Sequence, residues 1–161
     1  MVEMTFSGLA HDANGRQTMI LLVDPSRSRQ VPIWINHSQA ENIIAIFKDD
    51  FSPQPSIHEL MMDLIKVGGF HLEKVILHSL TANRYEALLN FEVLKSEESK
   101  GPKNSIEPFQ TTAHPSDAIT LALRSKCKIW MYENDIANTS LPVDPLADEL
   151  DQKKFRLFLE S

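Results

Sequence analysis

The chain has 161 residues and a net charge of −6, from 16 basic and 22 acidic side chains. Its length and its hydrophobic content of 42% suit one folded domain and exclude a fully disordered chain. Cys127 is the single cysteine, which excludes an internal disulfide. The acidic balance disfavours stable coating of nucleic acid, which needs clustered lysine and arginine. It leaves open a transient contact with one phosphate group.

The sequence carries no sign of a membrane segment or of secretion. No apolar run approaches the ~18 residues that a membrane-spanning helix needs. Residues 1–12 include Glu3 and Asp12 and no basic stretch, so no secretory signal is expected. We therefore expect a cytoplasmic protein that does not enter a membrane.

The first 35 residues predict a meander of three strands. Apolar and polar residues alternate over 2–8, and Asn14-Gly15 is a strong hairpin turn. Apolar runs of strand length follow at 19–23 and 31–35. Pro32 gives the last run the character of an edge strand, and an edge strand allows homo-oligomerisation.

Helical spacing follows the meander. One apolar stripe predicts a helix over 40–47, and a second predicts a helix from Ser56 to about Val67. Gly68 suits the end of the second helix. The side chains expected on its core face are Ile57, Leu60, Met61 and Leu64.

The rest of the chain predicts further strands, one more helix and a helical tail. The expected elements are strands at 72–80, 84–93, 106–112 and 129–132, a polar loop at 95–104, a helix at 115–125, an irregular linker at 138–145 and a terminal helix at 146–159. Strands occur in runs, so the sequence predicts an α+β fold with a mostly antiparallel sheet. We expect one domain over 1–135, followed by a linker and a C-terminal helix over 136–161.

The second helix begins with a capping box. Ser56 and Glu59 have the Ser-x-x-Glu spacing in which each side chain accepts a hydrogen bond from the other residue's backbone N–H. His58 is not explained by that motif. It is either a surface histidine or a general acid or base, because imidazole titrates near neutral pH.

The third helix begins in a similar way. Pro115 suits the first helical position, and Asp117 then lies where a carboxylate favours the helix dipole. Asp117, Thr120 and Arg124 fall on one polar face. Asp117 and Arg124 are either a structural pair or part of a site for a phosphate or a metal.

Both helix starts are Pro-Ser sequences, and free amides at helix N-termini suit phosphate binding. If the two starts face each other, they form an anion site with His58 and His114 beside it. A separation of more than about 15 Å would exceed the reach of any side chain and exclude this arrangement.

Four segments, taken in order, resemble the bifunctional nuclease domain family. They are Pro32 to Ile35, Gln54 to Leu60, His114 to Ile119, and Leu121 to Arg124, and the resemblance covers most of 1–135. It implies an α+β fold and an activity on RNA and DNA phosphodiesters, with nucleic acid as a transient substrate.

The chain departs from the family pattern at four positions. Gln54 and His114 stand where the family usually has arginine, Ile57 where it has threonine, and Glu59 where it has aspartate. Glutamine cannot replace a charged bidentate donor to phosphate. A binding or regulatory domain without strong catalysis is therefore the alternative to a nuclease.

The resemblance implies a site built from the two helix starts, assisted by Mg²⁺ or Mn²⁺ and by no organic cofactor. The spacing of the acidic residues does not locate the metal ligands. The residues expected in catalysis are His58, Glu59, His114, Asp117 and Arg124, and those expected to bind substrate are Gln54, Ser56 and Ser116.

Overall fold

A computed structural model of the chain describes residues 1–12, 14–48, 54–81, 84–94 and 107–144. Its elements are β1 (Val2–His11), β2 (Thr18–Val23), β3 (Arg29–Ile35), α1 (His37–Phe47), α2 (Ile57–Val67), β4 (Phe70–Thr81), β5 (Arg84–Val93), β6 (Phe109–Ala113), α3 (Pro115–Ser125), β7 (Lys128–Met131), α4 (Glu133–Thr139) and β8 (Leu141–Pro142).

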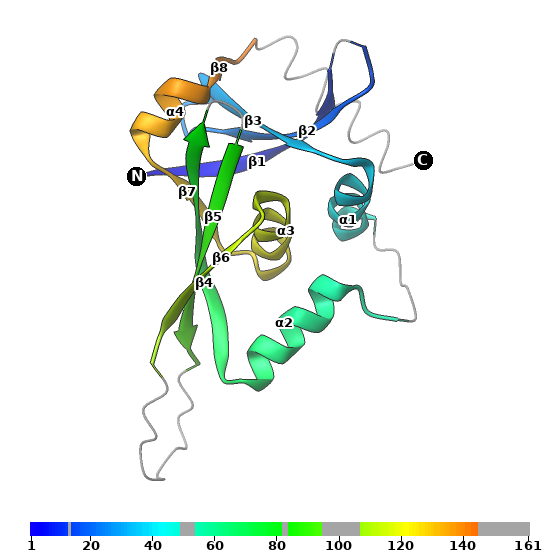
Figure 1. Cartoon of the computed structure of the whole chain (residues 1–161), viewed down its shortest axis with the longest axis vertical. Coiled ribbons are helices and arrows are strands. Elements are labelled where there is room, and N and C mark those ends of the chain that lie inside the picture. Colours follow the sequence, from blue (N-terminus) through cyan, green and yellow to red (C-terminus); the bar gives the residue numbers. More distant parts are fainter. Residues whose placement is uncertain (13, 49–53, 82–83, 95–106, 145–161) are drawn as a thin grey trace.

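The strands form one sheet in the order β6-β5-β4-β7-β1-β2-β3-β8. Every neighbouring pair is antiparallel except β4 and β7, which run parallel. Figure 1 shows the sheet curving around α3. Helices α1 and α2 lie on the side of α3 that faces away from strands β4 to β7. The expected α+β class, the antiparallel sheet and the opening meander are confirmed.

The core lies between the curved sheet and α3. Seven of the eleven residues of α3 are buried, with Ile119 fully enclosed. β3 and β5 bury alternate residues, as strands of a sheet with one buried face should, whereas β2 buries four consecutive residues. Ile20 on β2, for example, lies opposite Ile33 on β3, and both are buried. None of the described helices is long and apolar enough to cross a membrane.

The expected core face of α2 is wrong. Ile57, Leu60, Met61 and Leu64 are all exposed, and the helix turns its Met62 and Ile65 side chains toward the core instead. The spacing i, i+3, i+4, i+7 identifies an apolar stripe, but it does not say what the stripe contacts.

The C-terminal part of the described chain is more regular than expected. The predicted irregular linker at 138–145 begins within α4 and includes β8. Ile136 on α4 is fully buried in the main core, and the boundary expected after residue 135 falls inside this helix. The terminal helix expected at 146–159 lies outside the described residues.

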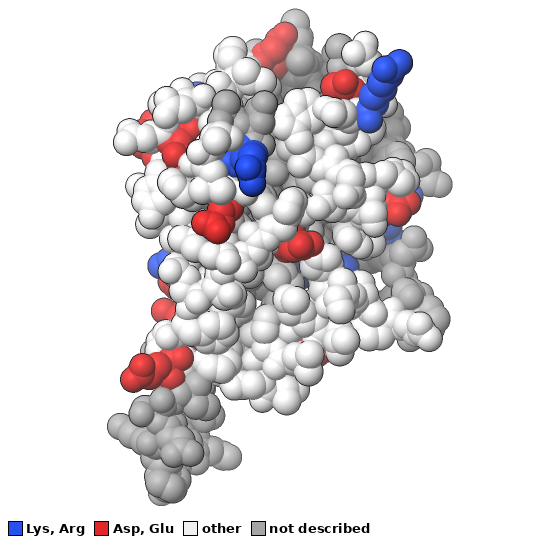
Figure 2. Space-filling view, viewed as in Figure 1, with Lys and Arg blue, Asp and Glu red and all other residues white. Residues whose placement is uncertain are grey.

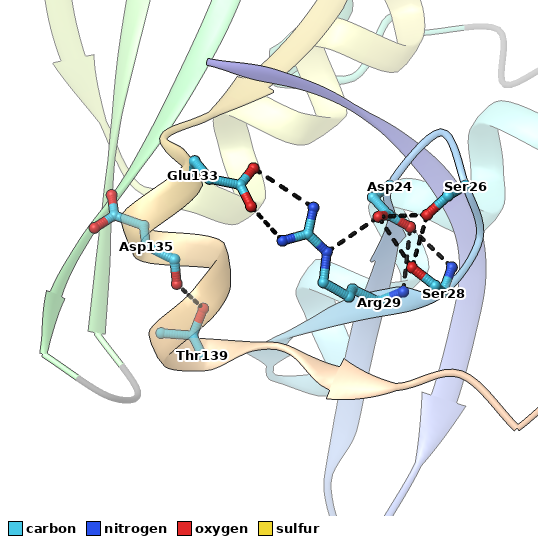
Figure 3. Close-up of polar contacts among 7 residues, drawn as sticks. All are labelled: Asp24, Ser26, Ser28, Arg29, Glu133, Asp135 and Thr139. Atoms are coloured by element: carbon cyan, nitrogen blue, oxygen red, sulfur yellow. Dashed lines mark hydrogen bonds and ion pairs between the residues drawn. The ribbon is translucent and has the colours of Figure 1, made fainter.

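A buried carboxylate organises the turn between β2 and β3. Asp24, 3% exposed, accepts hydrogen bonds from the Ser26 hydroxyl at 2.8 Å, from the Ser28 amide at 3.0 Å, and from both the amide and Nε of Arg29 at 3.1 Å. Figure 3 shows Arg29 reaching on to Glu133, so the network joins this turn to α4.

Burial by itself would raise the pKa of Asp24, but the hydrogen bonds from Ser26, Arg29 and Ser28 outweigh it. They lower the pKa of Asp24 from 3.8 to about 2. Because this pKa is lower in the folded chain than in the unfolded one, ionised Asp24 stabilises the fold above about pH 4. That stabilisation is lost as the pH falls through about 2.

We expect Asp24→Asn to lower the free energy of unfolding by about 2 kcal/mol at neutral pH. The amide has one acceptor oxygen in place of two. It cannot accept both the Ser28 and Arg29 amides, which now reach Oδ1, and the Ser26 hydroxyl and Arg29 Nε, which now reach Oδ2. Urea denaturation from neutral pH to about pH 2 should show the difference from wild type shrinking below pH 4. Asp63→Asn, at an exposed position on α2, is the matched control. A stability difference between wild type and Asp24→Asn that stays constant from neutral pH to about pH 2 would contradict a lowered pKa of Asp24.

Candidate functional site

The buried helix α3 brings a carboxylate to the protein surface at its first turn. Pro115 occupies the first helical position, and the His114 ring caps the helix by accepting the Ser116 amide at 3.4 Å. Ser116 is 1% exposed, whereas the Asp117 side chain is 50% exposed. Asp117 is therefore the group of this first turn that can meet a ligand.

The start of α2 is fixed by the predicted capping box. The Ser56 hydroxyl accepts the Glu59 amide at 3.3 Å, and Glu59 Oε2 accepts the Ser56 amide at 2.7 Å. These bonds satisfy two of the free N–H groups at the helix start. They also fix the direction in which His58 and Glu59 leave the helix.

The first turn of α2 lies against α3 through two polar links. His58 Nε2 is 3.2 Å from Asp117 Oδ1, and Arg124 Nη1 donates to Glu59 Oε1 at 2.9 Å. Thr120 lies between Asp117 and Arg124 in the sequence of α3, is 1% exposed, and donates its hydroxyl to the Ser116 carbonyl at 2.7 Å. The polar face predicted for α3 is therefore the face on which α2 docks.

Glu59 is fully engaged in this arrangement. The Ser56 amide lowers the pKa of Glu59 most strongly, and Arg124 lowers it further, although partial burial opposes both. One carboxylate oxygen accepts from Ser56 and the other from Arg124. An ionised carboxylate with both oxygens occupied fixes the geometry of the site and is poorly suited to act as a base.

Asp117 is held differently. The His58 side chain is 6% exposed, and its Nδ1 atom is buried without a hydrogen-bond partner in the described part of the chain. A carboxylate only accepts hydrogen bonds, so the proton of this contact is carried by His58 Nε2. The buried imidazole thus orients a half-exposed carboxylate, whose Oδ2 has no recorded hydrogen bond to another described residue.

Comparison with known proteins identifies the family of this chain. The family model of the bifunctional nuclease domain matches residues 20–144, which are 125 of the 161 residues. The chain belongs to the bifunctional nuclease domain family. It is also similar to two uncharacterized proteins of Mycobacterium tuberculosis, one from strain CDC 1551 and one from strain H37Rv. Each is 27% identical over 169 residues, an alignment that covers 100% of this chain and 94% of the relative.

Only some of the residues expected in the site of this bifunctional nuclease domain contact one another. The structure brings together Ser56, His58, Glu59, Asp117 and Arg124. His114 is exposed and directs Nδ1 toward the Ser116 hydroxyl at 2.8 Å, and Gln54 is exposed just before α2. Ser116 is buried and offers no surface to a substrate.

Sequence reasoning named the residues that meet here but did not predict their pairing. His58 and Asp117 are 59 residues apart in the chain, and Glu59 and Arg124 are 65 apart. Local spacing pointed instead to a pair between Asp117 and Arg124 on α3. The two cross-helix links follow from the docking of α2, and no local motif encodes that docking.

We expect Ser56→Ala to lower the free energy of unfolding by about 1 kcal/mol, because the Glu59 amide loses its cap. Chemical denaturation at neutral pH measures this change. Glu59→Gln should lower the free energy of unfolding by less than Ser56→Ala does. Glutamine also serves in a capping box, and the ion pair of Glu59 with Arg124 is partly solvated. Ser38→Ala at an exposed position of α1 is the control. Equal stability of Ser56→Ala and this control would contradict the capping role.

Proposed function

We propose that this member of the bifunctional nuclease domain family hydrolyses phosphodiester bonds of RNA or DNA at the junction of α2 and α3. The observation that carries the proposal is the buried His58 ring held against the half-exposed carboxylate of Asp117. Burying a ring nitrogen without a partner costs free energy, so such an atom is rarely kept without a role. Family membership supplies the class of reaction.

The roles follow from exposure. Asp117 is the catalytic residue, because its half-exposed carboxylate can accept a proton from an attacking water or hydroxyl group. His58 is a positioning residue, since its ring lies beneath Asp117 and contacts a ligand only through it. Glu59 and Arg124 hold α2 on α3 and thereby keep His58 in place.

The site offers a divalent metal one carboxylate ligand, Asp117. Mg²⁺ usually keeps several waters and binds through one or two carboxylates together with phosphate oxygens of the substrate. Asp117 offers one such carboxylate oxygen, and among the described residues no three His, Cys, Asp or Glu side chains gather as a metal cluster. A bound Mg²⁺ or Mn²⁺ would neutralise charge on the phosphate, and the chain's own contribution would be Asp117.

A second function, a binding or regulatory domain, is favoured by the charges around the site. Arg124 is already paired with Glu59, and Gln54 and His114 supply no fixed positive charge. On the face that Figure 2 shows, the lysine and arginine side chains among the described residues are scattered between acidic ones. A nuclease usually needs positive charge at the scissile phosphate.

We expect purified protein to cleave single-stranded RNA or DNA in the presence of Mg²⁺ or Mn²⁺ and to lose activity in EDTA. Asp117→Asn should reduce the cleavage rate at least ~100-fold, because an amide neither accepts a proton nor binds the metal as a carboxylate does. Initial rates on labelled oligonucleotides measure the effect.

The matched control is Asp135→Asn, which alters a second histidine–aspartate pair. Asp135 Oδ2 is 2.9 Å from His78 Nδ1, and α4, which carries Asp135, lies at the opposite end of the molecule from α2 in Figure 1. This control should retain the wild-type rate. Equal rates for wild type and Asp117→Asn would indicate a contaminating nuclease or a different site. Absence of cleavage in all three proteins would favour the binding domain.

We expect the double substitution Gln54→Arg with His114→Arg to strengthen binding of a single-stranded oligonucleotide about tenfold or more at low salt. Arginine adds charge at both positions, and at 114 it also releases the Ser116 amide that the histidine ring now occupies. Titrations at two salt concentrations measure this gain, and lysine at both positions tests charge without bidentate geometry. Unchanged binding would show that these positions do not contact phosphate.

A further inference from the structure

The exposed stripe of α2 is an apolar surface on a regular, capped helix. Its five side chains run the length of the helix and are exposed at 44% or more. They are Ile57 at 66%, Leu60 at 44%, Met61 at 44%, Leu64 at 62% and Val67 at 85%. Isolated apolar residues on a surface need no explanation, but a continuous group on one helix marks a contact surface.

The helix is apolar on two sides. Met62 and Ile65 pack on the core beside the buried His58, and the stripe faces away from them. The remaining side carries Glu59, Asp63 and Lys66. A helix with so little polar surface normally has neighbours on both apolar faces, and the described residues supply a neighbour for only one.

The spacing of the stripe identifies what kind of neighbour fits. Ile57, Leu60, Leu64 and Val67 are separated by three, four and three residues, which is the a-d-a-d pattern of a two-helix seam. Read backwards, the spacing is the same. Two antiparallel copies of α2 would therefore place Ile57 opposite the partner's Val67, and Leu60 opposite the partner's Leu64.

We propose that the α2 stripe is the interface of a homodimer in which two α2 helices pack antiparallel about a two-fold axis. A two-fold interface must be complementary to itself, and the reversible 3-4-3 spacing meets that requirement. Nucleic acid does not fit this surface, because Lys66 is the only cation of α2 and lies outside the a and d positions.

The length of the seam sets the expected affinity. Eleven residues of helix rise about 16 Å, so the contact is smaller than the standard interface of roughly 800 Å² per partner. We expect a dissociation constant of the order of micromolar. The antiparallel arrangement places the last turn of the partner's α2 beside the turn that carries His58 and Glu59. The dimer would thus brace the helix that supports the proposed site, although the proposal does not depend on catalysis.

Sedimentation of the full chain across roughly micromolar to hundred-micromolar concentrations tests the dimer. The wild-type mass should rise from 18.3 kDa toward twice that value as concentration increases. Leu60→Glu with Leu64→Glu should weaken association at least ~100-fold, because the new carboxylates meet across the interface. Both positions are exposed in one copy, so the fold should survive and circular dichroism should match wild type.

The matched control is Leu80→Glu with Leu141→Glu, at apolar positions that are 52% and 53% exposed on β4 and β8. This variant should associate like wild type. A wild-type mass of one chain at every concentration would overturn the proposal, as would a dimer that the α2 substitutions leave intact. The wild-type protein could also be a monomer whose unfolding temperature falls when Leu60 and Leu64 are replaced. That result would mean that another part of the same chain covers the stripe, and it would overturn the proposed dimer.

Cysteine cross-linking tests the antiparallel orientation in a Cys127→Ala background. A mixture of Leu60→Cys and Leu64→Cys proteins should form the mixed disulfide several-fold faster than either protein cross-links with itself, because cross-linking requires Cα atoms within about 7 Å. Faster self-cross-linking of each single variant would indicate parallel helices and would overturn the proposed arrangement.

Discussion

The burial of α3 inside the curved sheet is the constraint on which the rest of the structure depends. Most of this helix is enclosed, including the polar Ser116 and Thr120. Polar groups that lose water need partners, and Thr120 finds one in the Ser116 carbonyl. Asp117 and Arg124 lie on the face of α3 that the sheet does not cover. A helix that contacts both side chains therefore has to dock on this face of α3. The first turn of α2 does so.

The two polar contacts between α2 and α3 have the same arrangement. Each joins a largely buried group on one helix, His58 at 6% or Arg124 at 15%, to a half-exposed carboxylate on the other. Such partly solvated pairs contribute little stability. The apolar contacts of Met62 and Ile65 are better placed to hold α2 on the body. The polar links therefore set the register of the helices, which is what a site at their junction requires.

Local patterns predicted the local structure well. The alternation in the opening strands and the capping box of Ser56 and Glu59 depend on residues a few positions apart, and the structure confirms both. Periodicity assigns the stripe of α2 to the core, wrongly, because it reveals that a face is apolar and not what covers that face. The pairing of His58 with Asp117 depends on how distant elements pack, and no spacing in one sequence encodes that.

The residue at 114 shows how a single change alters what a helix start can do. A histidine ring nitrogen accepts the Ser116 amide, whereas an arginine has no acceptor atom and would leave that amide free. Free amides and a nearby cation are what attract an anion to a helix N-terminus. In this chain the histidine caps α3 and the fixed charge is absent. The function that we propose for this junction therefore rests more on the oriented carboxylate of Asp117 than on capture of phosphate by the start of α3.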